Sequence, residues 1–251
     1  MTTRASRRAA RGGYEMAASL RTILCIAAHP DDNEFLIAGS VARWTREGRD
    51  VLFCLVTTGG AGTNEHTPSA EGLIPIRERE TREAARILGV RDVIFLGYQD
   101  GVLEPTIGLR RDLTRVIRRV RPDVVVCGDP TQRWYGNEYL NHPDHRAAAS
   151  AALDAVFPSA ETRAIFPELL TEGLEPHKVK EVLITGAVPA DTFVDVAETL
   201  ATKCAALRAH ASQVGPGEGI EPLLRGWAAE AGKRAGLAAA EGFRRIVLNG
   251  G

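Results

Sequence analysis

The sequence predicts a single α/β domain with a mostly parallel sheet flanked by helices on both faces. Short runs that are apolar throughout alternate with longer amphipathic stretches from Ile23 to Val196. Strands of this kind are buried on both faces, which is typical of a parallel sheet covered by helices. The length of 251 residues suits one large domain with a substantial core.

The individual elements follow from apolar spacing, with strands in short runs and helices where apolar residues recur at helical spacing. The expected strands are 23–28, 51–57, 93–96, 124–127, 182–185 and 193–196. The expected helices are 35–47, 76–88, 109–120 and a segment after Pro143. Gly48 and Gly89 stand where glycine commonly ends a helix. From Ala197 onward the chain is expected to be mostly helical, with a Gly/Pro break at 215–219.

Composition limits the domain boundaries and the partners. Residues 1–20 are expected to be a disordered N-terminal extension, and residues 21–251 a single domain. The net charge of -1 removes the electrostatic argument for binding nucleic acid or an anionic membrane. No stretch approaches the ~18 apolar residues of a membrane span. Four widely spaced cysteines, three of them in apolar runs, favour a reducing compartment, so we expect a cytoplasmic protein.

Polar segments follow four of the predicted strands. They are AHPDDNE, TTGGAGTNEH, GYQDG and GDPTQRWYGNEYLNHPDH. In open α/β sheets, ligands bind beyond the carboxyl ends of the strands. We therefore expect the functional chemistry to collect at this one edge of the sheet.

Two of these segments carry histidines and acids at metal-binding spacing. His29 and Asp32 are three residues apart, and so are His142 and His145. Pro143 suits the first position of a helix, where the helix dipole disfavours the charged imidazolium that could not bind a metal. Catalytic zinc takes three protein ligands of these types. The alternative for each cluster alone is a polar turn or a capped helix start, but together they favour one metal site with one histidine left over.

Both segments resemble the paired motifs of a known family. AHPDDNE near the N-terminus with NHPDHRA around residue 145 resembles the PIG-L/LmbE-like zinc-dependent N-deacetylases, and most of all the branch that contains diacetylchitobiose deacetylases. Weaker similarity lies in 58–62, 76–89, KCAALRAHASQ at 203–213 and EGF at 241–243. The resemblance implies a Rossmann-like fold and removal of an N-acetyl group from an N-acetylglucosamine-type amino-sugar derivative. It also implies a homo-oligomer, a hexamer or a trimer.

The resemblance further implies roles for single residues. The expected ligands of one zinc ion per chain are His29, Asp32 and His145. Zinc would acidify a water molecule, and Asp31 would accept its proton as the general base. His142 would stabilise the tetrahedral oxyanion or protonate the leaving amine, two roles that the sequence leaves open. Asp144 would steady a histidine beside it.

Other polar residues are weighed against plainer explanations. The resemblance places Arg77 against sugar hydroxyls, although a solvated arginine is an equal alternative. Asp100 is a second candidate for a substrate hydroxyl, or a residue of the Asp-Gly turn. We expect His210 to be structural, and His66 and His177 to lie at the surface.

Two other functions are considered. His29 and Asp31 with a distant histidine also match the iron triad of non-haem oxygenases, although those usually have all-β scaffolds. A non-catalytic metal- or sugar-binding relative would be expected to lack Asp31 or His142, and both are present. Which N-acetylated compound is the substrate stays open, because the segments 62–76, 129–141 and 157–178 that would shape specificity name no sugar.

Overall fold

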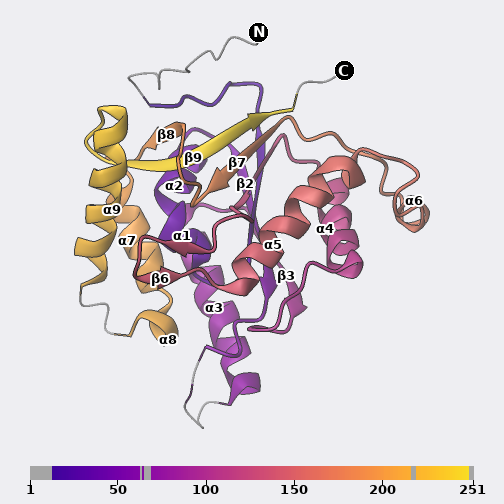
Figure 1. Cartoon of the computed structure of the whole chain (residues 1–251), viewed down its shortest axis with the longest axis horizontal. Helices are drawn as coiled ribbons and strands as arrows, with labels where there is room; N and C mark the ends of the chain where they lie inside the picture. Colours follow the sequence, from indigo (N-terminus) through magenta and orange to yellow (C-terminus); the bar gives the residue numbers. More distant parts are fainter. Residues whose placement is uncertain (1–12, 63, 65–68, 216–218, 249–251) are drawn as a thin grey trace.

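A central sheet of seven strands organises the described part of the chain, which in this computed structural model comprises residues 13–62, 64, 69–215 and 219–248 (Figure 1). The strand order is β3-β2-β1-β4-β7-β9-β8. The strands are β1 (Thr22–Ala27), β2 (Asp50–Thr57), β3 (Asp92–Tyr98), β4 (Val124–Gly128), β7 (Glu181–Thr185), β8 (Thr192–Asp195) and β9 (Ala240–Val247). β9 runs antiparallel to both of its neighbours, β7 and β8, and the other four strand pairings of this sheet are parallel. The predicted mostly parallel α/β fold is confirmed.

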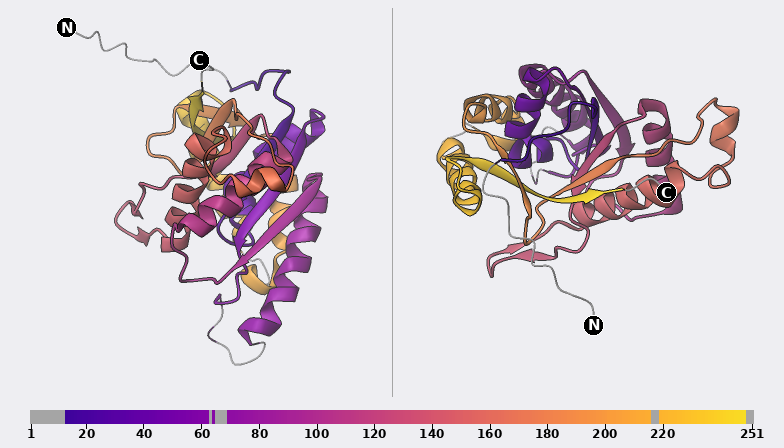
Figure 2. Two further views of the ribbon diagram at one scale, coloured as in Figure 1. Left: turned by 90° about the vertical axis from the view of Figure 1, so that its right-hand side faces the viewer. Right: turned by 90° about the horizontal axis from the view of Figure 1, so that it is seen from above.

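Helices cover both faces of the sheet, as the views in Figure 2 show. One face carries α2 (Ala38–Arg46), α3 (Ala70–Leu88), α7 (Leu200–Arg208) and α9 (Ile220–Ala235). The other carries α4 (Ile107–Val120), α5 (Pro143–Asp154) and the π-helical turn η1 (Ala155–Ala160). The remaining short elements are α1 (Asp32–Leu36), α6 (Glu168–Thr171), α8 (Ala211–Val214) and the hairpin strands β5 (Trp134–Tyr135) and β6 (Tyr139–Leu140). No helix of the described residues is long and apolar enough to cross a bilayer.

Alternate residues of β1 belong to different cores. Ile23 and Cys25 pack in the apolar cluster on the α2 face, whereas Leu24 and Ile26 pack in the cluster on the α4–α5 face. All four side chains are buried. A strand with two buried faces must be apolar at every position, which is why this run carries no alternating pattern.

The chain changes direction across the sheet at β1. Strand β1 pairs with β2 on one side and with β4 on the other, and all three are parallel. Such a switch point opens a crevice beyond the carboxyl ends of the strands. His29 follows β1, and the segment from His142 to His145 follows β4. The two motifs, more than a hundred residues apart, therefore meet at one place.

The C-terminal part departs from the prediction because it ends in a strand rather than a helix. β9 inserts between β7 and β8, although its sequence AEGFRRIV contains charges. Glu241 accepts hydrogen bonds from the backbone of α2, and Arg245 pairs with Glu181. These partners satisfy the charges of Glu241 and Arg245, whereas the side chain of Arg244 is exposed.

The N-terminal boundary also differs from the prediction. Residues 1–12 of the expected extension lie outside the described residues, but residues 13–20 pack on the domain. Met16 and Leu20 are buried in the core, and the Tyr14 hydroxyl donates to Oε2 of Glu181 over 2.8 Å. A smaller difference is that the helix expected at 35–47 is divided into α1 and α2 at Ile37.

Candidate active site

The first part of the site is a tight turn between β1 and α1. Asp31 has a φ of 97°, in the left-handed region that is costly for residues with a side chain but tolerated by aspartate. The backbone nitrogen of His29 donates to Oδ2 of Asp32 over 2.9 Å. This bond folds the Asp32 carboxylate back toward the histidine. Strained conformations of this kind are concentrated at functional sites.

Three side chains from the two motifs converge. Nε2 of His145 lies 3.1 Å from Oδ1 of Asp32 and 3.1 Å from Nδ1 of His29. Nδ1 of His29 lies 3.6 Å from Oδ2 of Asp32. One donor atom from each of the three residues falls within 4.8 Å of the others. Two imidazole nitrogens and a carboxylate at this spacing form a donor set that a zinc ion accepts.

The ring of His145 is oriented by Asn141, which the sequence motif contains but to which we assigned no role. The amide nitrogen of Asn141 donates to the Gln132 carbonyl over 2.7 Å, so the amide oxygen faces His145. Nδ1 of His145 lies 2.9 Å from that oxygen and must be the donor. In the neutral ring, Nε2 then keeps a lone pair that points to His29 and Asp32, as a metal ligand requires.

His29 is held in the complementary way. Its Nε2 lies 3.1 Å from Oδ1 of Asp100 and 3.5 Å from Oδ2 of Asp144. These carboxylates favour a hydrogen on Nε2, which leaves Nδ1 as the atom that faces His145 and Asp32. The residues present therefore fit a bound divalent ion: each histidine offers an unprotonated nitrogen to the same point.

The electrostatics of this group favour a cation. Burial alone would lower the pKa of His29, but Asp100 and Asp32 outweigh it and raise the pKa to about 10. Burial would raise the pKa of Asp32, but His145 and His29 outweigh it and lower that pKa. The acidic groups thus attract positive charge at the centre, whether it is a proton or a metal ion.

The second acid of the first motif behaves differently from its neighbour. Asp31 is only partly exposed, and burial together with the charges of Asp32 and Glu34 raises its pKa well above the ordinary value. A carboxylate with a raised pKa is a stronger proton acceptor than usual. The structure therefore gives the two adjacent aspartates opposite electrostatic environments.

His142 and Asp144 lie on the other side of His29. Asp144 is fully buried, and its carboxylate accepts from the backbone nitrogens of Gly101 (2.7 Å) and Leu103 (3.1 Å). His142 caps α5, because its Nδ1 accepts from the Asp144 backbone nitrogen over 3.2 Å. The neutral ring then carries its hydrogen on Nε2. Burial and the neighbouring His29 lower the pKa of His142, which favours this neutral form.

The two expected substrate residues both contact the glycine-containing loop after β2. The guanidinium of Arg77 is buried and donates to the carbonyls of Gly59 and Gly62. A Cβ at Gly62 would lie 2.3 Å from Nη2 of Arg77, so a side chain there would displace this guanidinium. Oδ2 of Asp100 accepts from the Ala61 nitrogen over 2.9 Å. Asp100 thereby links this loop to His29.

His210 and His177 do not belong to the group of candidate metal-binding side chains. His210 is completely buried, beside Glu34. His177 is half-buried, with Nε2 2.7 Å from the Pro122 carbonyl oxygen. His66 falls outside the described residues.

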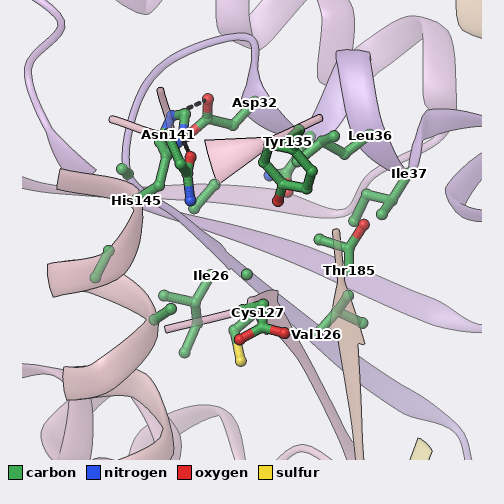
Figure 3. Close-up of a pocket in the computed structure, with 17 residues that line it drawn as sticks. Ile26, Asp32, Leu36, Ile37, Val126, Cys127, Tyr135, Asn141, His145 and Thr185 are labelled. Carbon is green, nitrogen blue, oxygen red and sulfur yellow. Dashed lines mark hydrogen bonds and ion pairs between the residues drawn. The ribbon is translucent and has the colours of Figure 1, made fainter. Parts of the chain in front are cut away.

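A pocket opens directly beside Asp32 and His145 (Figure 3). Figure 3 shows these two residues with Asn141 on one side, and Tyr135, Leu36 and Thr185 opposite. Its further lining includes Ile26, Val126 and Cys127. Tyr135 belongs to the β5–β6 hairpin, which we did not predict because strands of two residues leave no pattern. The hairpin and α1 thus form walls of a cavity next to the candidate metal centre.

Comparison with known proteins identifies the family. The sequence profile of the PIG-L family, described as GlcNAc-PI de-N-acetylase, matches residues 24–156, which include both motifs. A diacetylchitobiose deacetylase of Thermococcus kodakarensis is 34% identical over 229 residues, covering 90% of this chain and 84% of the relative. The chain belongs to the PIG-L family.

Other PIG-L relatives agree in sequence and in structure. A probable N-acetyl-alpha-D-glucosaminyl L-malate deacetylase of Bacillus anthracis is 30% identical, covering 77% of this chain and 81% of the relative. The solved N,N'-diacetylchitobiose deacetylase of Pyrococcus horikoshii superposes with a TM-score of 0.84 at 31% identity, covering 91% of this chain and 84% of that one. The resemblance seen in the paired motifs is therefore confirmed over almost the whole chain.

Proposed function

We propose that this chain is a zinc-dependent hydrolase that removes the N-acetyl group from an N-acetylglucosamine-type amino-sugar derivative. His29, Asp32 and His145 would hold one zinc ion per chain. The observation that carries the proposal is the orientation of both histidines, whose outer nitrogens are engaged by Asn141 and by Asp100. A bound zinc ion would lower the pKa of a water molecule to ~7 and would polarise the amide carbonyl.

Two further residues would carry the proton and the developing charge. Asp31, whose pKa is raised by burial and by Asp32 and Glu34, would accept a proton from the attacking water. His142 in its neutral form would donate from Nε2 to the oxyanion of the tetrahedral intermediate. Asp144 would act indirectly, by holding the 101–103 turn and the His29 side of the site.

The substrate class is supported by the pocket and by the relatives. The pocket beside the metal ligands has an apolar floor that suits the methyl of an acetyl group. The relatives named above are described as deacetylases of diacetylchitobiose and of a glucosaminyl malate. Arg77 and Asp100 stay candidates for sugar hydroxyls, once the loop at 59–62 gives up its bonds to them.

Acetate release from a panel of N-acetylated sugars tests the proposal. The panel would contain N-acetylglucosamine, diacetylchitobiose and N-acetylglucosamine joined to malate or inositol. We expect acetate from at least one compound, loss of activity after chelation, and recovery with one equivalent of zinc. Full activity in protein shown by elemental analysis to be free of metal would contradict the mechanism.

No observation favours the alternatives considered above. The oxygenase hypothesis used Asp31 as the carboxylate ligand, whereas Asp32 is the acid that joins the two histidines. Loading the protein with Fe²⁺ and measuring oxygen consumption tests that hypothesis directly. A non-catalytic binder would bind zinc and a panel sugar without releasing acetate.

A further inference from the structure

A short segment near the C-terminal end of the chain contacts the turn that carries the two aspartates. It runs from His210 to Gln213 and includes most of α8. Nε2 of Gln213 donates to the carbonyl oxygen of Pro30 over 2.9 Å, a contact between residues 183 apart in sequence. The function proposed above gives no role to this segment, which is part of the KCAALRAHASQ stretch.

The hydrogen-bond directions along this contact can be assigned. A carbonyl oxygen only accepts, so the nitrogen of the Gln213 amide must face Pro30. The second hydrogen of that nitrogen points to Nδ1 of His210, 3.2 Å away. Nδ1 therefore accepts, and the neutral ring carries its hydrogen on Nε2, which lies 3.4 Å from Oε2 of Glu34. Both His210 and Glu34 are buried.

Gln213 and His210 contact the turn on both sides of Asp31. Pro30 immediately precedes Asp31, and Glu34 lies on α1, one helical turn after it. α1 has five residues and begins without a side-chain cap, so it has little stability of its own. The left-handed backbone of Asp31 is also unfavourable unless its surroundings hold it. The turn therefore needs an external support, and the 210–213 segment supplies one.

We propose that Gln213 and His210 are positioning residues that hold Asp31 and Asp32 in the geometry required for proton transfer and metal binding. Gln213 fixes the backbone before Asp31 through its hydrogen bond to the Pro30 carbonyl. The buried His210 packs against Glu34 of α1, after Asp31, with Nε2 3.4 Å from Oε2 and no hydrogen bond between them. The inference rests on the proposed function, because it takes Asp31 as the base and Asp32 as a metal ligand. Neither positioning residue is expected to touch the substrate or the metal.

The same segment offers a matched control. Ser212 is adjacent to Gln213 but bonds in another direction, since its backbone nitrogen and hydroxyl both contact Glu80 of α3, over 2.8 and 2.6 Å. Ser212→Ala removes the hydroxyl bond from this segment and leaves the contacts to Pro30 and Glu34 in place. Its effects therefore report general weakening of the segment rather than loss of the support to the turn.

The test compares Gln213→Ala and the isosteric Gln213→Glu with Ser212→Ala. A glutamate carboxylate has the size of the amide but cannot donate to the Pro30 carbonyl. The dissociation constant for zinc is measured by competition with a chromophoric chelator, and kcat, KM and Tm are measured separately. We expect both Gln213 variants to bind zinc ~10–100-fold more weakly, the scale typical of residues that orient a metal site. We also expect them to have a lower kcat and an unchanged KM. Ser212→Ala should match wild type in zinc affinity and in kcat.

Two results would overturn the inference. One is zinc affinity and kcat in the Gln213 variants that equal those of Ser212→Ala. The other is a loss of zinc affinity and kcat in all three variants in proportion to the fall in their Tm, which would mean that the 210–213 segment has only a general packing role. Because zinc affinity needs no substrate, it decides the inference even if wild-type protein binds zinc and releases no acetate, the result that would reject the proposed deacetylase.

Discussion

The nitrogen that each histidine offers to the candidate metal site is decided by the polar group on the far side of its ring. Asn141 accepts from Nδ1 of His145, and Asp100 faces Nε2 of His29. As a result, one histidine offers Nε2 and the other Nδ1 to the same centre. The carboxylate of Asp32 is the third donor at this centre. The hydrogen-bond partners of these three residues, and not the three residues alone, give them the orientation that a metal site requires.

The opposite environments of the two adjacent aspartates lead to different predictions for their variants. Asp31→Asn keeps the size of the side chain and all three proposed ligands, but the amide cannot accept a proton. Metal content should stay near wild type while kcat falls by ~10²–10⁴-fold. Asp32→Ala removes a ligand, so metal content and activity should both be lost, with partial recovery at high zinc.

Elemental analysis and steady-state kinetics of both variants check this prediction. Loss of metal from Asp31→Asn with retention in Asp32→Ala would reverse the two roles. Unchanged turnover in both would remove the two aspartates from the mechanism.

At the scale of elements, a buried ion pair joins α7, β9 and the start of α2. Glu241 of β9 accepts from the backbone nitrogens of Gly39 (3.0 Å) and Ser40 (2.7 Å), at the positive end of the α2 dipole. Nζ of Lys203, on α7, lies 2.6 Å from Oε1 of the same carboxylate. α2 follows directly after α1, which carries Asp32, so this pair anchors the helix next to the first motif.

Removal of one partner of this pair should be strongly destabilising. Lys203→Met leaves Glu241 as a buried charge without its cation and should lower the free energy of unfolding by ~3–5 kcal/mol. Lys233→Met removes a cation from the exposed pair with Glu230, and should change stability by less than ~1 kcal/mol. Urea denaturation of both variants measures the difference.

The double variant Lys203→Met, Glu241→Gln tests whether the charge itself is responsible. Its loss of unfolding free energy should be smaller than the sum of the losses in Lys203→Met and Glu241→Gln, because no uncompensated charge remains in the double variant. Additive losses would show that the two residues stabilise the protein independently.

At the scale of the whole molecule, the N-terminal segment is attached to the sheet through Glu181. Its carboxylate accepts from the hydroxyl of Tyr14 and from Nε of Arg245, each over 2.8 Å. Burial would raise the pKa of Glu181, but these two partners outweigh it and lower the pKa. The ionised form is therefore more favourable in the folded protein than in the unfolded chain.

This shift predicts how the stability of the fold depends on pH. A lowered folded-state pKa stabilises the protein fully above the unfolded value of about 4.3, and that contribution is lost as pH falls through the folded-state pKa. Glu181→Gln should therefore cost roughly 1–3 kcal/mol at pH 7 and progressively less below about pH 4. Thermal unfolding of both proteins across this range checks the sign. An equal difference at all pH values would contradict it.

The outer surface of the β5–β6 hairpin supports the expectation of a homo-oligomer. Leu140 and Trp134 pair across the hairpin on the face opposite to the pocket-lining Tyr135, and they are 81% and 59% exposed. Apolar groups gathered on a surface are typical of an interface. We predict that light scattering at micromolar concentration gives a mass above that of one chain, and that Leu140→Asp lowers it. A monomer in both would reject the prediction.

Much of the fold and of the site was determined by local sequence. Fully apolar runs such as Ile23–Ala28 predicted the parallel strands, because burial on both faces leaves no polar position. The two histidine motifs were assigned to one edge of the sheet, since parallel strands end there together. Both predictions depend on residues close in sequence, where spacing is sufficient.

Only the tertiary structure decided the contacts between distant segments. Glu241 of β9 is buried because Lys203 and the start of α2 satisfy its carboxylate, and Arg245 pairs with Glu181; no local pattern contains that information. The hydrogen bond from Gln213 to the Pro30 carbonyl likewise joins residues 183 apart in sequence. A buried polar group is tolerated only where a partner meets it, and the sequence names the group without naming the partner.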